Sequence, residues 1–94
     1  MRVEWDESKS RSKLAKHGVG FETARLVFED AYHLSIRDRD EDGEERWQTF
    51  GFVGGVVLLR VAHTWSEQGG EEIVRIISAR RATARERARY EQGD

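Results

Sequence analysis

The sequence predicts an α+β fold, with helices packed on an antiparallel sheet. Its apolar residues follow helical spacing up to about residue 28 and alternate with polar residues from about residue 32. Three glycine-containing turns then separate four successive strands, which favours hairpins. The predicted order is a short N-terminal strand, two helices, a four-stranded antiparallel sheet and a C-terminal helix. At 94 residues, the chain is expected to form one domain, residues 1–94.

The first 28 residues predict a strand and two helices. Residues 1–5 alternate as in a short strand, and Asp6 and Gly18 suit the N-cap and C-cap of a helix over residues 7–17. Leu14 is the main apolar anchor of this helix. Three lysines share a face roughly opposite Leu14: Lys9, Lys13 and Lys16. A second helix is predicted from an apolar stripe of Phe21, Ala24, Val27 and Phe28.

The remaining residues predict four strands and one helix. The strands cover residues 32–37, 46–53, 56–65 and 71–79, and their turns contain Asp42-Gly43, Gly54-Gly55 and Gly69-Gly70. Thr83 and Glu86 match the capping box, so the last helix is expected to start at Thr83 and to reach about residue 91.

The composition excludes several classes of site. The chain has no cysteine, which rules out disulfides, thiolate metal sites and a cysteine nucleophile. The histidine spacings match no common metal-ligand motif, and the chain has neither a P-loop nor a glycine-rich nucleotide loop, so no metal and no cofactor is expected. The longest apolar stretch, VVLLRVA, is too short to span a membrane, and a signal-peptide pattern is missing. A cytoplasmic protein is therefore expected.

The net charge of −2 hides a strong asymmetry. Residues 38–45 contain six acids and one arginine, whereas residues 73–90 contain six arginines and one acid. Arginine outnumbers lysine thirteen to three, and arginine is suited to bidentate recognition of phosphate. This segregation indicates a basic functional face, although a charge run is usually a solvated surface.

Arg80 and Arg81 are the first candidates for binding phosphate. They lie between the last strand and the N-cap Thr83, where a helix N-terminus supplies N–H donors and a positive dipole end. The alternative is that both arginines pair with the acidic stretch 38–45.

Arg60 and Arg75 interrupt apolar strands, and burying such a charge without a partner is costly. One expectation is that they form a positively charged patch on one sheet face, next to Arg80 or Arg81. The alternative is that they pair with acids such as Glu45 or Glu72.

Histidines and aromatic residues supply the candidates for proton transfer and stacking. His17 ends the lysine-bearing helix and is the best placed to act as a general acid or base, although plain helix capping would also explain it. His63 falls on an apolar face and is interpreted as a core or rim histidine. Tyr90 lies on a helix with few other apolar residues, so that helix needs a partner or a role in solvent.

Two blocks, EWDESKSRSKLAKHGVGFETA and RIISARRATARERARYE, resemble the signatures of the BrnT toxin family, the toxin halves of bacterial type II toxin–antitoxin pairs. The middle segments ERWQTFG and LLRVAHTW follow in the expected order, and the likeness covers nearly the whole chain. The resemblance implies a RelE/ParE-like fold, metal-independent cleavage of RNA, and a BrnA antitoxin, a ribbon-helix-helix protein through which the complex binds DNA. Lys13 stands where family members often have Asn. Two roles of the first helix therefore stay open: a contribution to catalysis, or RNA binding alone. The residues that match are Trp5, Asp6, Lys9, Lys16, His17, Gly18, Arg60, His63, Ser78, Arg80, Arg81, Arg85, Glu86 and Tyr90.

The leading hypothesis from these residues is attack of a ribose 2′-OH on the adjacent phosphate. Arg60, Arg80 and Arg81 would stabilise the developing charge. Lys16 or His17 would act as base, and Tyr90 or a histidine as acid. Lys9, Lys13 and Arg85 would bind RNA. Two alternatives are a non-catalytic module that binds a partner or nucleic acid through its basic C-terminal segment, and a ParE-like toxin directed at gyrase.

Overall fold

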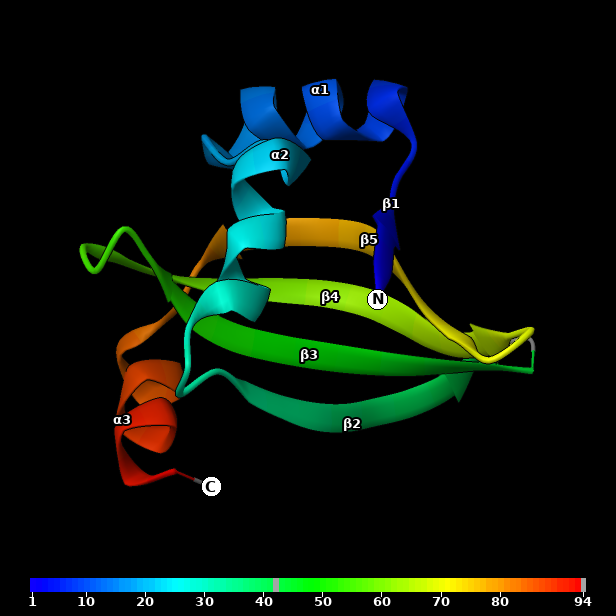
Figure 1. Cartoon of the computed structure of the whole chain (residues 1–94). Coiled ribbons are helices and arrows are strands. Elements are labelled where there is room, and N and C mark those ends of the chain that lie inside the picture. The colour runs from blue at the N-terminus through cyan, green and yellow to red at the C-terminus, as the bar shows by residue number, and fades with distance from the viewer. Residues whose placement is uncertain (42, 94) are drawn as a thin grey trace.

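The computed structural model describes residues 1–41 and 43–93, so Asp42 of the expected turn lies outside the described residues. These described residues form five strands, three α-helices and one 3₁₀ helix (Figure 1). In chain order the elements are β1 (Arg2–Glu4), α1 (Glu7–His17), α2 (Phe21–Ala24), η1 (Arg25–Glu29), β2 (Leu34–Glu41), β3 (Glu44–Val53), β4 (Val57–Gln68), β5 (Glu71–Arg81) and α3 (Ala84–Gln92).

The sheet has five strands and is mixed, which corrects the expected four-stranded antiparallel sheet. Its strand order is β1-β5-β4-β3-β2. Strands β2 to β5 form successive antiparallel pairs as expected, but β1 joins the edge of β5 in parallel, with Arg2 opposite Ile73. The alternation of residues 1–5 predicts this strand, but its partner is about 70 residues away and leaves no mark on the local pattern.

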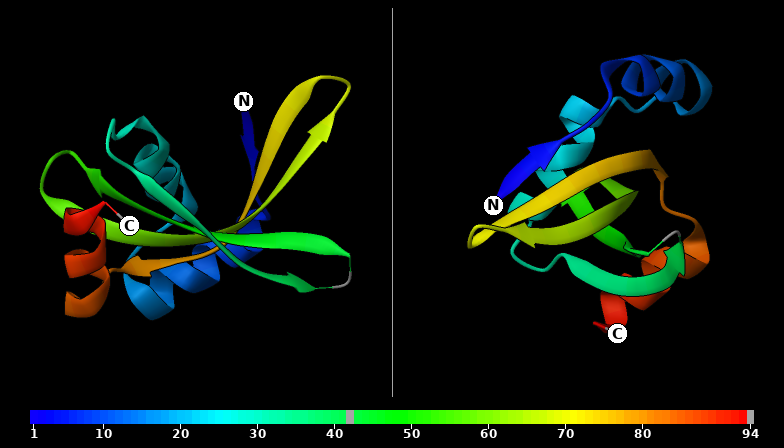
Figure 2. Two further views of the ribbon diagram at one scale, coloured as in Figure 1. Left: turned by 90° about the horizontal axis from the view of Figure 1, so that it is seen from below. Right: turned by 90° about the vertical axis from the view of Figure 1, so that its right-hand side faces the viewer.

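The long strands separate at one end of the sheet into two hairpins. Pairing of β3 with β4 ends at Arg46 and Thr64, whereas β4 and β5 remain paired as far as Gln68 and Glu71. Pairing of β2 with β3 continues to Glu41 and Glu44, further into the acidic stretch than predicted. Figure 2 shows the two hairpins diverging towards their tips.

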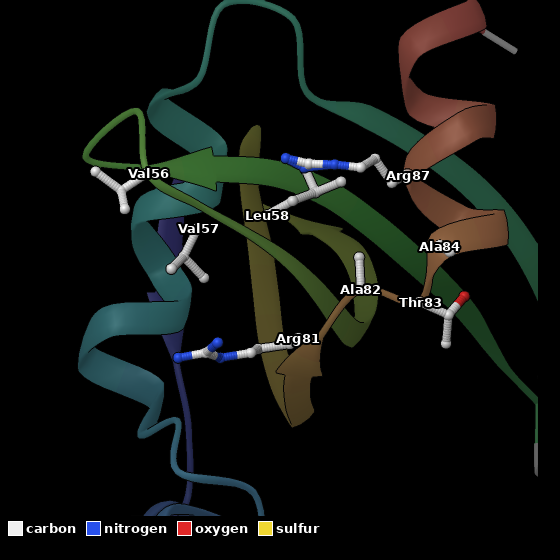
Figure 3. A pocket seen from close by; sticks show the side chains of 8 residues that line it. All are labelled: Val56, Val57, Leu58, Arg81, Ala82, Thr83, Ala84 and Arg87. Atoms are coloured by element: carbon white, nitrogen blue, oxygen red, sulfur yellow. The ribbon is translucent and has the colours of Figure 1, made fainter.

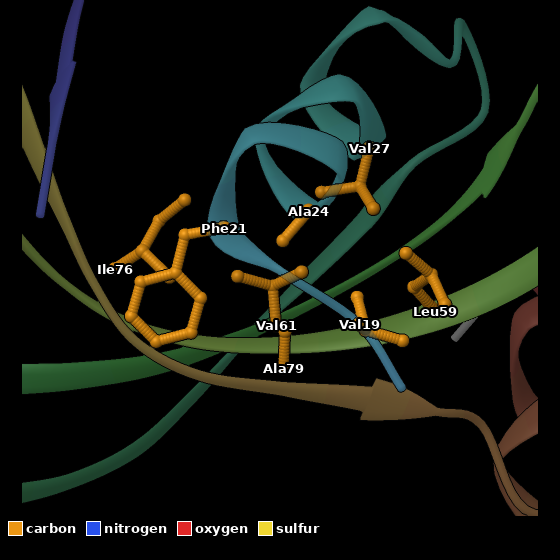
Figure 4. Close-up of a cluster of buried hydrophobic side chains, with 8 residues drawn as sticks. All are labelled: Val19, Phe21, Ala24, Val27, Leu59, Val61, Ile76 and Ala79. Carbon is orange, nitrogen blue, oxygen red and sulfur yellow. The ribbon is translucent and has the colours of Figure 1, made fainter. Parts of the chain in front are cut away.

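The main core lies between one sheet face and the segment that contains α2 and η1 (Figure 4). The predicted second helix is confirmed only in part, because it continues as the 3₁₀ helix η1 after Ala24. Gly51 on β3 allows close packing here, since a Cβ at this position would lie 2.7 Å from the backbone oxygen of Val27. The buried cluster consists of Val19, Phe21, Ala24, Val27, Leu59, Val61, Ile76 and Ala79.

Helix α1 packs against β5 with a face that the sequence does not predict. Asp6 and Gly18 cap it as expected: the Asp6 carboxylate accepts from Ser8 N–H and Lys9 N–H, and Gly18 is left-handed. Leu14, however, is 51% exposed, and the buried position is Ser10, whose hydroxyl accepts a 2.9 Å hydrogen bond from Phe21 N–H. A polar contact to the next helix, rather than apolar burial, therefore fixes α1.

Helix α3 begins at the predicted capping box and packs on the sheet face opposite the main core. Its contact is Phe52, which pairs across the strands with Leu58 rather than with the core residue Leu59. The Tyr90 ring meets Phe52 edge-on at 5.5 Å, and the Arg87 guanidinium lies 5.1 Å from the Phe52 ring centroid. None of the helices in the described ranges is long and apolar enough to cross a bilayer.

Candidate functional site

Two arginines from neighbouring strands lie side by side in the sheet. Arg60 on β4 is directly opposite Arg80 on β5, and we call these two residues the arginine pair. Side chains alternate between the faces of a strand, so the pair lies on the face opposite Leu59 and Val61, away from the main core. The structure therefore places Arg60 next to Arg80, as expected from the sequence.

Arg60 is a half-buried cation without a carboxylate at ion-pair distance in the part of the chain that the structure describes. Its Nε donates to the Gln48 side-chain oxygen at 3.2 Å, and its two terminal nitrogens make no hydrogen bond to the described residues. Burial lowers the pKa of Arg60, and the charge of Arg80 lowers it further, while the carboxylates of Glu86 and Asp38 oppose this. The free fork of Arg60 is suited to two oxygens of an anion.

Arg80 is held by the first turn of α3. Its terminal nitrogens donate to both oxygens of Glu86, at 2.8 and 3.0 Å, and one also reaches the Arg81 carbonyl at 3.1 Å. Glu86 also accepts from Thr83 N–H at 2.9 Å, so one carboxylate closes the capping box and orients the arginine. The hydrogen bonds from Arg80 hold the pKa of Glu86 at about 2.

Two lysines of α1, Lys13 and Lys16, add positive charge around His17. Desolvation lowers the pKa of His17, and the charges of Lys16, Lys13, Arg80 and Arg60 lower it further, in that order. A neutral imidazole at pH 7 is thereby favoured within electrostatic range of the arginine pair, and the neutral imidazole is the form that accepts a proton.

Arg81 does not join the pair, although the sequence suggested that Arg80 and Arg81 act together. It is opposite Leu59, so it belongs to the other face of the sheet. Figure 3 shows its side chain directed away from α3, towards the segment that contains α2 and η1. Adjacent residues in a strand point to opposite faces, and this alternation separates the two arginines.

The hydroxyl of Tyr90 is engaged elsewhere. It donates to Asp30 Oδ2 at 2.6 Å, and the same oxygen accepts from Phe52 N–H at 2.8 Å. Burial and then the bond to Asp30 raise the pKa of Tyr90 to about 12. This arrangement ties α3 to η1 and β3 and leaves Tyr90 poorly suited to the role of general acid.

Two predicted RNA contacts and one candidate base lie on exposed surface. The predicted RNA contacts are Lys9 on α1 and Arg85 on α3, and the candidate base is Lys16 on α1. Lys13, which is half-buried, lies one helical turn before His17.

Arg75 and His63 have structural partners. Arg75 is exposed and lies 3.7 Å from Glu4 on the adjoining strand β1, which replaces the suggested partners Glu45 and Glu72. His63 is buried and bonds through Nε2 to the Thr49 hydroxyl at 2.7 Å and through Nδ1 to the Thr64 carbonyl at 2.9 Å. A carbonyl only accepts, so Nδ1 carries the proton and Thr49 donates to Nε2. His63 is therefore a core histidine, as interpreted from the sequence.

Sequence reasoning missed Gln48 and the contact of Glu86 with Arg80. The sequence predicts Glu86 as a capping-box residue and as a match to the family signature, but not as the partner of Arg80. Glu86 follows Arg80 at the turn from strand to helix, where a returning helix brings the two together. Gln48 carries no local signal, because its contact with Arg60 depends on the register of β3 against β4.

Comparison with known proteins identifies the family. The family model described as "Ribonuclease toxin, BrnT, of type II toxin-antitoxin system" matches residues 5–86. The chain belongs to the BrnT family. The BrnT family is one of ribonuclease toxins, and its matched segment contains the arginine pair, Gln48, Glu86 and His17. Tyr90 lies beyond it.

A crystal structure of the ribonuclease toxin BrnT of Brucella abortus is similar to this chain, with 29% sequence identity and a TM-score of 0.62. The alignment covers 88% of this chain and 97% of the Brucella chain. Among curated proteins no match is found.

Proposed function

We propose that this BrnT-family toxin cleaves RNA at the arginine pair, without a metal ion. The observation that carries the proposal is Arg60, a half-buried cation whose fork has no partner among the described residues. Arg80 beside it raises the local positive charge, and the two together suit a phosphodiester, whose charge increases in the transition state.

The reaction proposed is transfer of the phosphate to the neighbouring ribose oxygen. The 2′-oxygen forms a bond to phosphorus while the bond from phosphorus to the 5′-oxygen breaks, which leaves a 2′,3′-cyclic phosphate and a 5′-hydroxyl. Neutral His17 takes the proton of the 2′-OH, and solvent returns a proton to the 5′-oxygen. Arg60 and Arg80 hold the non-bridging oxygens as negative charge builds on them. Gln48 orients Arg60, and Glu86 orients Arg80.

The decisive test is cleavage of RNA by the purified protein in the presence of EDTA. We expect Arg60→Ala and Arg80→Ala each to lower the cleavage rate by a factor of about 100 or more, the range typical for loss of one stabilising contact. The matched control is Arg75→Ala, which removes an exposed arginine of β5 that is paired with Glu4. Unchanged cleavage by both pair variants would refute the assignment.

A second candidate is a non-catalytic module that binds RNA or a partner. The bidentate bond of Arg80 to Glu86 favours it, because that fork is occupied in the free protein. Under this alternative the wild-type protein binds RNA without cutting it, and the same variants lose binding alone.

Membership of a type II family implies an antitoxin, and we propose that it is a BrnA-type ribbon-helix-helix protein, through which the complex binds DNA in the cytoplasm. The polar helix α3 and the neighbouring sheet edge are the surface proposed for it, in keeping with a RelE/ParE-like toxin. Three arginines on this short helix leave much polar surface exposed: Arg85, Arg87 and Arg89. Hydrogen exchange in α3 that does not slow on complex formation would refute this surface.

A further inference from the structure

A hollow lined by tryptophans and acids lies near the end of the sheet where β3 and β4 stop pairing. Figure 2 shows the backbones of the β2–β3 and β4–β5 hairpins diverging there. The hollow has a volume of about 530 Å³. It forms where pairing between β3 and β4 stops at Arg46 and Thr64, so that the backbone of residues 65–68 has no strand partner on the β3 side among residues 1–41 and 43–93. The residues that line it are Glu45, Trp47, Trp65, Ser66, Glu67 and Glu72.

Two half-buried tryptophans form the aromatic wall of this hollow. The rings of Trp47 and Trp65 meet edge to face, with centroids 5.4 Å apart. Each indole N–H donates to an acid on the rim: Trp47 to Glu45 at 3.3 Å and Trp65 to Glu72 at 3.0 Å. The rings are thus fixed at their polar edges while part of their apolar surface stays in contact with solvent.

The rim contains two acids that have no basic partner among the residues that the structure describes. Glu67 and Glu72 are directly opposite each other on β4 and β5, a placement in which like charges destabilise a sheet. Neighbouring acids are compensated: Glu71 lies 3.4 Å from Arg2, and Glu45 lies 3.6 Å from Arg37. Within the described part of the chain, no basic group lies within ion-pair distance of Glu67 or Glu72.

We infer that the hollow binds a basic, extended segment of a partner polypeptide. An arginine or lysine of that segment lies between Glu67 and Glu72 and relieves their repulsion, while its side chain packs on the tryptophan rings. The segment runs along residues 65–68, whose unpaired backbone accepts a further strand. RNA is disfavoured as occupant, because acids on the rim repel phosphate.

The hollow is separate from the arginine pair. Trp65 is five residues beyond Arg60 on β4, which corresponds to about 16 Å along a strand. Trp65 and Arg60 also lie on opposite faces, since five is an odd number of positions. The inference therefore does not depend on the proposed ribonuclease site, and each of the two fails on its own test.

The test is an NMR titration of the ¹⁵N-labelled protein with an acetylated, amidated hexapeptide of alternating arginine and alanine. We expect the indole N–H signals of Trp47 and Trp65 to shift and saturate, and that of Trp5, which donates to Glu7, to stay in place. In the variant Glu67→Gln/Glu72→Gln the peptide should bind at least about tenfold more weakly, which is about 1.4 kcal/mol. A peptide with glutamate in place of arginine should not bind.

The matched control is Glu22→Gln/Glu29→Gln, which makes the same change of charge at two exposed acids of α2 and η1. We expect this control to bind the peptide within about twofold of wild type. An equal loss of affinity in both double variants, equal shifts of all three indoles, or no shift of Trp47 and Trp65 would overturn the inference. Shifts of these two signals with an RNA oligonucleotide would overturn the choice of occupant. RNA cleavage and thermal unfolding of the same variants show whether the fold is intact.

Discussion

At the scale of single residues, the site depends on which face of a strand each arginine occupies. Arg80 and Arg81 are adjacent in sequence, yet Arg80 faces Arg60 and Arg81 faces Leu59. The alternation of strand side chains separates them by the thickness of the sheet, so only one of the two acts with Arg60.

This separation predicts unequal effects of two neighbouring substitutions. We expect Arg80→Ala to lower RNA cleavage by about 100-fold or more, and Arg81→Ala by less than about fivefold, because only Arg80 faces the phosphate. Single-turnover cleavage rates of the two variants make the comparison. Equal losses would show that the strand end twists enough to bring both arginines to one substrate.

His17 predicts a pH dependence. A base must be neutral to accept a proton, and the pKa of His17 is lowered from 6.5 by desolvation and by its cationic neighbours. Protonation should therefore slow the reaction with a midpoint below pH 6.5, and the rate should level off as the pH rises towards about 8. His17→Gln should remove this acidic limb along with most of the activity. If the cleavage rate of His17→Gln still falls over the same acidic pH range as that of wild type, the base is another group.

At the scale of elements, α3 is held at both ends by side-chain contacts rather than by a buried apolar face. Glu86 bonds to Arg80 at its first turn, and Tyr90 bonds to Asp30 at its last. No residue of α3 is fully buried, so these two contacts and the packing on Phe52 position the helix.

The Glu86 contact predicts a loss of stability in acid. Its pKa is lowered from 4.5 to about 2 in the folded protein, so its stabilising effect is complete above pH 4.5 and is lost as pH falls towards 2. Glu86→Gln should be less stable than wild type at pH 7, and this gap should narrow by roughly 1–2 kcal/mol at pH 3. Urea unfolding of both proteins at the two pH values measures it. A gap that does not depend on pH would mean that capping alone, and not the charge, stabilises α3.

The Tyr90 contact predicts an effect on stability rather than on chemistry. Tyr90→Phe removes a hydrogen bond to a carboxylate and should lower the free energy of unfolding by roughly 1–2 kcal/mol. Asp30 retains its bonds from the N–H groups of Phe52 and Tyr32, which limits the loss. RNA cleavage should stay within about threefold of wild type once the protein is folded. A 100-fold fall in cleavage with unchanged stability would instead assign Tyr90 as the general acid.

At the scale of the whole molecule, the local signals in the sequence predict which helices and strands form better than they predict which of these elements lie next to each other. The caps Asp6, Gly18 and Thr83 are all where the pattern puts them, because capping depends on residues within one turn of the helix. Three other features depend on residues far apart in sequence: the partner of β1, the buried face of α1, and the contact of Gln48 with Arg60. Hydrophobic spacing gives no information about these features. In α1, the side chain that determines which face is buried is the polar Ser10.

The same distinction applies to the site. Arg60 and Arg80 were predicted from their chemistry, and their pairing follows from the register of β4 and β5. The sequence predicts that Arg80 and Arg81 both lie in the segment after the last strand, whereas β5 extends through Arg81, so the alternation of strand side chains applies to both residues.

The parallel pairing of β1 with β5 has a consequence for synthesis. Arg2 cannot find its place in the sheet until Ile73 has been made, and Arg80 comes later still. Chains can begin to fold while they are being synthesised, but here β1 cannot pair until β5 has been made. We therefore expect a nascent chain that stops before residue 70 to lack a protease-resistant core. A toxin built in this way acquires its fold and its arginine pair together, once β5 has been synthesised.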